Sequence, residues 1–218
     1  MPNIMFDSDY QKEEIKRNLE MIKLECDKVK DYVNIEIFPF EQLGDGQIGY
    51  SVDSGGNSLV TDDEDTWNEN WMVIAYETLC GDPIIIELNE DKYPVSLLMH
   101  GMDSWDSGSY LADSMESFLN IFKEIVYFLT EKQLLMGKRN IQHKELKAIL
   151  NNIIKISNTA DFETWESLLS PLFVIVEECE EALETKVKEM KKEGKKISEI
   201  AELLNLKPKD VYEYIKKI

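Results

Sequence analysis

Few side chains in this sequence have the types and spacing that catalysis or metal binding requires. The two histidines, His100 and His143, have no Cys or His at metal-ligand spacing, and the three cysteines form no C-x-x-C motif. No G-x-S-x-G, P-loop or G-x-G-x-x-G motif is present. His100 precedes Asp103 and Ser104, but residues of one turn rarely reach triad geometry, so we expect a structural role for it. The sequence therefore predicts no catalytic residue, no metal site and no cofactor.

The acidic side chains are concentrated in one part of the chain. Lys and Arg number 24 against 43 Asp and Glu, for a net charge of −19. In residues 31–122 the only basic residue is Lys92, against 19 acids. A field of this sign repels nucleic acid and anionic membranes and accelerates encounter with basic proteins. The alternatives are an acidic surface that only maintains solubility, or an enzyme in which two acids converge in a pocket with perturbed pKa values.

Two short loops combine acids with a tryptophan, a composition typical of an interface anchor inside a charged rim. In one, a run of four acids at 62–65 precedes Trp67; in the other, two aspartates flank Trp105. The run at 62–65 lacks the D-x-D-x-D-G order of an EF-hand, so no calcium loop is expected. Packing of both tryptophans inside their loops is the alternative. The predicted partner-binding residues are Asp62, Asp63, Glu64, Asp65, Trp67, Asp103, Trp105 and Asp106.

The elements that position these loops begin with a helix and continue with β structure. Ser8 and Gln11 form a capping-box pattern, and apolar residues then recur at spacings of three and four up to Val33. Runs rich in β-branched and aromatic residues, separated by turn residues, predict strands. The turn at 89–92 predicts a hairpin, and Ile84-Ile85-Ile86 is typical of a central strand covered on both faces. The predicted strands are 35–38, 48–52, 72–77, 84–88 and 95–100.

After Gly108 the apolar residues follow a helical period. Ser114 predicts the start of a helix that ends near Gly137, and segments 146–156 and 164–192 are also helical, with a break or kink at Pro171. We therefore predict an α+β domain over residues 1–136, with a mixed or antiparallel sheet of about five or six strands flanked by helices. An all-helical extension follows over residues 137–218.

Residues 71–122 combine a strand that begins near Trp71, the Gly81-Asp82 turn before the central strand, a strand that ends around His100, and a closing helix that contains Phe118. The resemblance of this pattern is to the SUKH superfamily, which includes the yeast cell-wall assembly regulator domain and many bacterial immunity proteins. It implies that these five residues form a structural motif. It also implies a non-enzymatic immunity protein that binds and neutralises a toxin, often a nuclease or another nucleic-acid-modifying enzyme.

The residues of this motif also have direct physical interpretations. Gly81 can adopt the positive φ of a tight turn, and the Asp82 carboxylate can accept hydrogen bonds from backbone N–H groups. We expect Trp71 to fill the core between the sheet and a helix.

The C-terminal residues 197–217 have the pattern of a helix-turn-helix. Ala201 supplies the small residue that faces the second helix, Asn205 replaces the usual turn glycine, and Pro208 suits the first turn of the second helix. The second helix lacks Arg, Asn or Gln for bidentate base contacts. If nucleic acid binds at all, we expect phosphate contacts; otherwise the tail packs as a helical bundle or mediates a homodimer. The lysines available for phosphate contact are Lys207, Lys209, Lys216 and Lys217.

The sequence favours an immunity-type protein whose acidic surface binds and neutralises a basic bacterial toxin. The alternative is a regulatory or scaffold protein with a DNA-binding helix-turn-helix. No apolar run approaches the roughly 20 residues that span a bilayer, and no signal-peptide pattern is present. Three dispersed cysteines suit a reducing compartment, so we expect a cytoplasmic protein.

Overall fold

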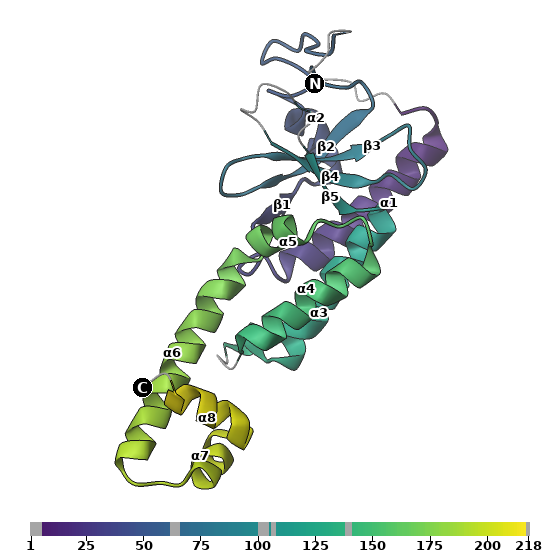
Figure 1. Cartoon of the computed structure of the whole chain (residues 1–218). Coiled ribbons are helices and arrows are strands. Elements are labelled where there is room, and N and C mark those ends of the chain that lie inside the picture. Colours follow the sequence, from purple (N-terminus) through teal and green to yellow (C-terminus); the bar gives the residue numbers. More distant parts are fainter. Residues whose placement is uncertain (1–5, 62–65, 100–104, 106–107, 138–140, 217–218) are drawn as a thin grey trace.

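The computed structural model describes residues 6–61, 66–99, 105, 108–137 and 141–216. It confirms the predicted α+β class: a five-stranded antiparallel sheet is followed by a helical C-terminal part (Figure 1). The strands are β1 (Ile35–Ile37), β2 (Trp71–Glu77), β3 (Pro83–Glu87), β4 (Val95–Leu98) and β5 (Gly108–Ala112). The helices are α1 (Asp9–Asp27), α2 (Leu43–Gly46), α3 (Met115–Glu131), α4 (His143–Ile156), α5 (Phe162–Leu168), α6 (Ser170–Lys192), α7 (Ile197–Leu204) and α8 (Pro208–Lys216), with short 3-10 turns η1 (Phe40–Gln42) and η2 (Leu134–Met136).

The sheet order is β1-β2-β3-β4-β5, so each strand pairs with its neighbour in sequence. The predicted β3–β4 hairpin is confirmed, with Ile85 opposite Ser96. Strand β5 follows the predicted strands and was missed from the sequence. Its outer edge is occupied: the carbonyl of Tyr110 accepts a hydrogen bond from the N–H of Asp161, and that of Leu111 accepts one from Trp165. This cover blocks further strand pairing at that edge.

Helices α1 and α3 cover one face of the sheet. The Ser8 side chain caps α1 and the Ser114 side chain caps α3, as the sequence predicted. The apolar stripe of α1, from Ile15 to Cys26, is buried against the sheet. The burial raises the pKa of the Cys26 thiol to about 12, so this thiol remains protonated and unreactive at neutral pH.

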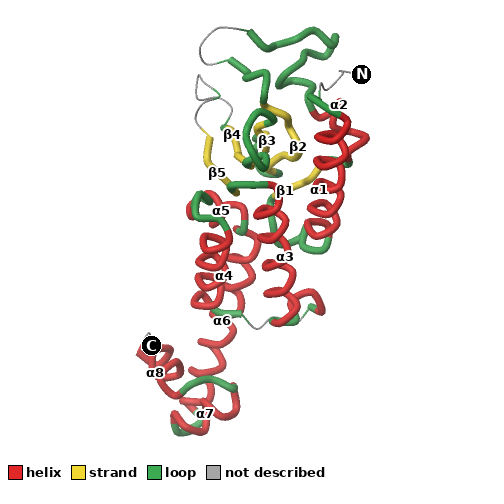
Figure 2. The backbone as a smooth tube through the Cα atoms, turned by 90° about the vertical axis from the view of Figure 1, so that its right-hand side faces the viewer, coloured by secondary structure: helices red, strands yellow, loops and turns green. Residues whose placement is uncertain are grey.

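Loops, and not helices, cover the other face of the sheet (Figure 2). There Val73, Ile85 and Leu98 pack against aromatic residues of the loops. The predicted strand at 48–52 is wrong: this segment forms turns and an isolated bridge between Ile48 and Val52. The physical reason is Gly49, whose φ of +91° turns the chain back on itself and prevents an extended run.

A buried glutamine attaches this loop layer to the sheet. The side-chain amide of Gln47 donates to the carbonyls of Leu43 and Val73, both at 2.8 Å, and its oxygen accepts the Val73 N–H at 3.0 Å. The register between β2 and β3 shifts between Val73 and Ala75. The Gln47 side chain therefore supplies hydrogen bonds to the backbone N–H and carbonyl of Val73 next to this irregularity.

We expect Gln47→Leu to lower the free energy of unfolding by about 2–4 kcal/mol, because it leaves buried backbone groups of Val73 without their partner. Urea denaturation measures this change. The control is Gln42→Leu, the same substitution at an exposed position nearby, for which a change within about 0.5 kcal/mol is expected. Equal stability of the two variants would contradict the assigned role of Gln47.

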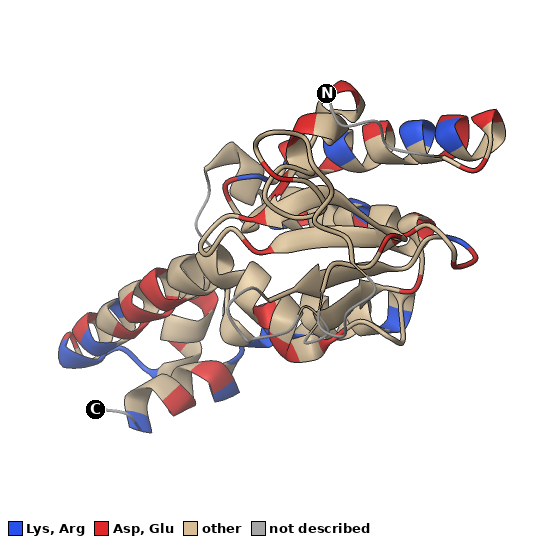
Figure 3. Cartoon of the chain, turned by 90° about the horizontal axis from the view of Figure 1, so that it is seen from above, with Lys and Arg blue, Asp and Glu red and all other residues tan. Residues whose placement is uncertain are grey.

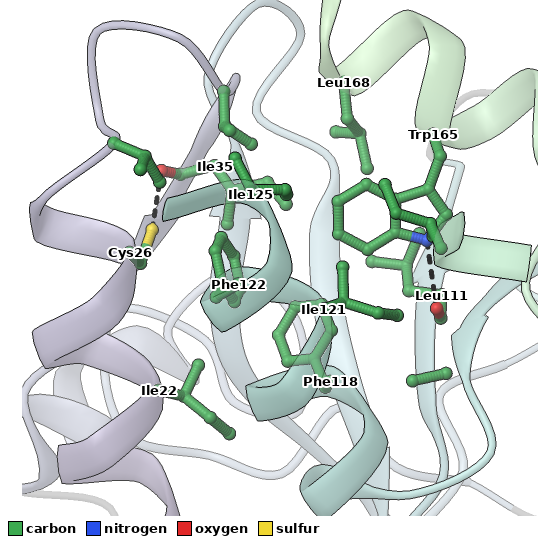
Figure 4. Close-up of a cluster of buried hydrophobic side chains, with 14 of the residues drawn as sticks. Ile22, Cys26, Ile35, Leu111, Phe118, Ile121, Phe122, Ile125, Trp165 and Leu168 are labelled. Carbon is green, nitrogen blue, oxygen red and sulfur yellow. Dashed lines mark hydrogen bonds between the residues drawn. The ribbon is translucent and has the colours of Figure 1, made fainter. Parts of the chain in front are cut away.

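The helical extension shares the hydrophobic core of the sheet. Trp165 of α5 is fully buried between β5 and α3, where its ring lies against those of Phe118 and Phe122 (Figure 4). The same cluster continues through α4 into the first part of α6, as far as Cys179. The predicted domain boundary between residues 136 and 137 stays a prediction. The main hydrophobic core contains residues from both sides of this boundary.

A second, smaller cluster lies at the end of the chain. Val187 of α6 packs with Ile200 and Ala201 of α7 and with Val211 and Tyr214 of α8. Both predicted helices of the tail are present, and Asn205 between them has a left-handed φ of 52°, as expected of a residue in place of the turn glycine. Pro208 begins α8, and Pro171 lies in the first turn of α6, after the break that follows α5.

Candidate functional site

The sequence-predicted contact residues fall into two groups. Asp62, Asp63, Glu64, Asp65, Asp103 and Asp106 lie outside the described residues, as does His100 of the structural motif. Trp67 and Trp105, the two proposed anchors, are described.

Trp67 is not an exposed anchor, which corrects the prediction for this residue. Only 2% of its surface is accessible, and its indole N–H donates to the carbonyl of Trp71 at 3.3 Å. The reason is that the second face of the sheet needs an apolar cover, and the loop that carries Trp67 supplies it. Trp105 is half-buried at the edge of the same cluster.

The two tryptophan loops meet on this face of the sheet. The ring centroids of Trp67 and Trp105 are 5.2 Å apart in an edge-to-face arrangement, and Tyr50 contacts both rings at 5.5 and 6.0 Å. These two tryptophans belong to the stretches of sequence, 62–67 and 103–106, in which the acids were predicted. No local pattern predicted this contact, because the two loops are almost 40 positions apart in the sequence.

Trp71 also differs from its prediction. It begins β2 and packs on Trp67 with ring centroids 5.6 Å apart, on the loop-covered face of the sheet. Alternation along β2 explains this position, because Met72 and Ile74 point to the helix-covered core and Val73 to the loop side. Phe118 of α3, in contrast, is fully buried in the main core.

The turn between β2 and β3 has the predicted glycine geometry. Gly81 has a φ of +80°, which an L side chain rarely adopts. The carboxylate of Glu77 accepts the N–H groups of Leu79 and Cys80 at 2.7 Å each, the kind of contact expected of Asp82. Tyr50 donates from its hydroxyl to the Gly81 carbonyl at 2.9 Å, so the turn is attached to the aromatic cluster. Burial raises the pKa of Tyr50, and the Asp82 carboxylate raises it further.

An acid-lined cleft of about 420 Å³ lies between this turn and α5. Its acidic lining consists of Glu77 at the end of β2, Asp82 of the turn, the α5 N-cap Asp161 and Glu163 of α5. Leu79, Leu97 and Met99 form an apolar part of the lining. Among the described residues that line the cleft there is no Lys or Arg. Asp161 also caps α5, accepting the N–H of Thr164 at 2.8 Å. Sequence reasoning missed the cleft, because Asp161 and Glu163 lie in a segment that was expected to be separate from the sheet.

Acidic side chains also surround the end of the β3–β4 hairpin. Burial raises the pKa of Glu87, the neighbouring Glu90 raises it further, and a hydrogen bond with Tyr110 opposes the shift. Figure 3 shows red acidic segments in the loops around the sheet, and both red and blue segments along the N-terminal helix and the C-terminal helices.

Within the described residues, no group of three or more His, Cys, Asp or Glu side chains could hold a metal ion. None of the described helices is both long enough and apolar enough to cross a membrane. In comparisons with known proteins, no family model, curated protein or solved structure matches this chain.

Proposed function

We propose that this chain is a non-catalytic, immunity-type protein that binds a basic protein toxin through the acid-rich loops and neutralises it by contact. The observation that carries the proposal is the contact of Trp67 with Trp105 at 5.2 Å. It brings together on one face of the sheet two loop tryptophans that have acidic neighbours in two separate parts of the sequence.

The electrostatic field supports a basic partner. Residues 31–122 contain a single basic residue, and the cleft beside the Gly81 turn is lined by four carboxylates. Such a surface attracts a positively charged protein over distances up to the Debye length and raises the rate of association. The resemblance to the SUKH superfamily supports the immunity class, and nucleases, with their basic clefts, are the toxin class that fits this charge. A cytoplasmic location is part of the proposal, because the three dispersed cysteines suit a reducing compartment.

The experiment first tests whether the product of the adjoining gene is a toxin against which this chain protects cells, and then measures the association rate of the two purified proteins at increasing NaCl concentration. We expect the rate to fall about tenfold or more between low and high salt. A variant in which the four acids at 62–65 are changed to amides is expected to lose about tenfold in rate at low salt. Loss of protection in cells that produce the toxin is the functional readout.

The matched control neutralises four exposed acids of the tail, which changes the net charge by the same amount. Its association rate is expected to stay within about twofold of the unmodified chain, because the charges lie on another surface. An equal loss in both variants, or a rate that does not respond to salt, would contradict the proposal. The four control positions are Glu189, Glu193, Glu202 and Glu213.

A second candidate function is DNA binding by α7 and α8, which their helix-turn-helix geometry favours. The exposed face of α8 carries Lys209 and Lys216, but Lys216 is paired with Glu213 at 3.3 Å. The acidic remainder of the chain would oppose approach to phosphate. Anisotropy of a labelled DNA duplex with the full chain separates the candidates: salt-sensitive DNA binding together with no toxin binding would favour the regulatory class.

A further inference from the structure

A groove of about 510 Å³ runs between α6 and α7, away from the acid-rich loops. Its centre is apolar: Ala182 and Leu183 of α6 face Leu203 and Leu204 of α7. Leu203 is 60% exposed, a large apolar surface for a side chain beside a groove. The groove therefore offers a place where a further apolar helix surface can pack.

The groove lies where neither hydrophobic cluster fully covers α6. The main core contacts this helix as far as Cys179, and the smaller cluster is centred on Val187. Between them Ala182 is exposed and small, so another backbone can approach closely. Val174, Glu178, Ala182 and Lys186 recur at intervals of four and form one exposed stripe along the helix.

The charges of α6 change sign after Glu184. Residues 177–184 contain five glutamates and no basic residue, whereas residues 186–192 contain four lysines and one glutamate. Figure 3 shows the change from red to blue along this long helix toward its outer end. An antiparallel copy of the same helix that crosses at Ala182 would place residue 186 of one copy beside residue 178 of the other, so a lysine meets a glutamate on each side of the crossing.

We propose that this groove binds α6 of a second copy of the chain and forms a dimer with its two-fold axis at Ala182. Glu178 and Lys186 both line the groove, four residues on either side of Ala182. Antiparallel pairing then sets Glu178 of one protomer beside the partner's Lys186, and the two-fold axis repeats this pair. The dimer leaves the tryptophan loops free, so it goes beyond the proposed toxin binding and can be tested without a toxin.

The first test is sedimentation equilibrium of the full chain over a range of concentrations. We expect a concentration-dependent species of twice the 25.3 kDa chain mass. Leu203→Glu is expected to raise the dimer dissociation constant at least tenfold, because it sets two carboxylates into the apolar centre. Leu24→Glu on α1, also at a position 60% exposed, is the matched control and should leave the constant unchanged. Circular dichroism verifies that both variants fold.

Charge exchange tests the predicted geometry. Glu178→Lys and Lys186→Glu are each expected to weaken the dimer about tenfold or more, because each creates two like-charge pairs across the axis. The double variant Glu178→Lys/Lys186→Glu restores opposite charges and should return the dissociation constant to within about threefold of the original. A chain that stays monomeric at all concentrations would overturn the proposal, as would a dimer indifferent to Leu203→Glu or a double variant as weak as the single ones.

Discussion

Trp165→Ala is expected to lower the free energy of unfolding by about 3–5 kcal/mol, a large part of the stability of a domain of this size. The side chain is completely buried, and its ring centroid lies 6.1 Å from that of Phe118 and 6.3 Å from that of Phe122. Its indole N–H donates to the carbonyl of Leu111 at 3.0 Å. The substitution thus leaves a cavity and removes a hydrogen bond in one step, and urea denaturation followed by circular dichroism measures the loss.

Two further variants separate these contributions. Trp165→Phe retains most of the apolar volume but leaves the Leu111 carbonyl without its donor, so a smaller loss of about 1–3 kcal/mol is expected. Tyr127→Ala removes an aromatic ring that is 62% exposed on α3 and should change stability by no more than about 0.5 kcal/mol. A Trp165→Ala variant as stable as Tyr127→Ala would show that α5 is not part of the core.

This result bears on how the chain divides into folding units. Trp165 belongs to the segment predicted as a separate extension, yet its partners Phe118 and Leu111 belong to the sheet and its covering helix. The outer edge of β5 is also occupied by Asp161 and Trp165. The extension therefore completes the core of the β domain, and only the tail around Val187 has a separate cluster.

Local sequence patterns predicted the elements whose stability is local. The serine caps of α1 and α3, the β3–β4 hairpin and the left-handed Asn205 each depend on residues within a few positions of one another. The periodicity of apolar residues also predicted which faces of these helices are buried. Such features are recognisable without knowledge of the tertiary partners.

The missed elements depend on distant partners. Strand β5 begins with Gly108 and Ser109, which have low strand propensity, and its pairing with β4 defines it. The segment at 48–52 has strand-forming residues, but Gly49 turns the chain, and the neighbouring Gln47 bonds to Val73, 26 positions away. Tertiary contacts outweighed the local propensity in both segments.

The position of the tryptophans in the candidate site was hidden for a similar reason. Polar neighbours on both sides of Trp67 indicated an exposed loop, but one residue of a polar loop can point inward while the others contact solvent. One signal was available: Ile84-Ile85-Ile86 predicts a strand buried on both faces, and only loop aromatics remained to cover the second face. That argument places Trp67, Tyr50 and Trp105 together.

Trp67→Ala is accordingly expected to act on folding, with a loss of about 3–5 kcal/mol in the free energy of unfolding. Its ring contacts Tyr50, Trp71 and Trp105, and its removal would leave Val73 and Ile85 of the sheet without their cover. Trp105→Ala should cost less, because Trp105 is only half-buried at the edge of the cluster. Thermal and urea denaturation of the two variants measure this order.

The proposed toxin binding should respond differently to the two tryptophans. Trp67→Phe retains an aromatic ring in the cluster, so toxin affinity is expected to stay within about threefold even though stability falls. Trp105→Ala removes the ring that remains partly accessible, and a loss of toxin affinity of more than about tenfold is expected, as for an interface anchor. If a stably folded Trp67→Phe protein lost much of its toxin affinity, Trp67 would instead belong to the contact surface. The conformation in which its ring is buried would then not be the one that binds the toxin.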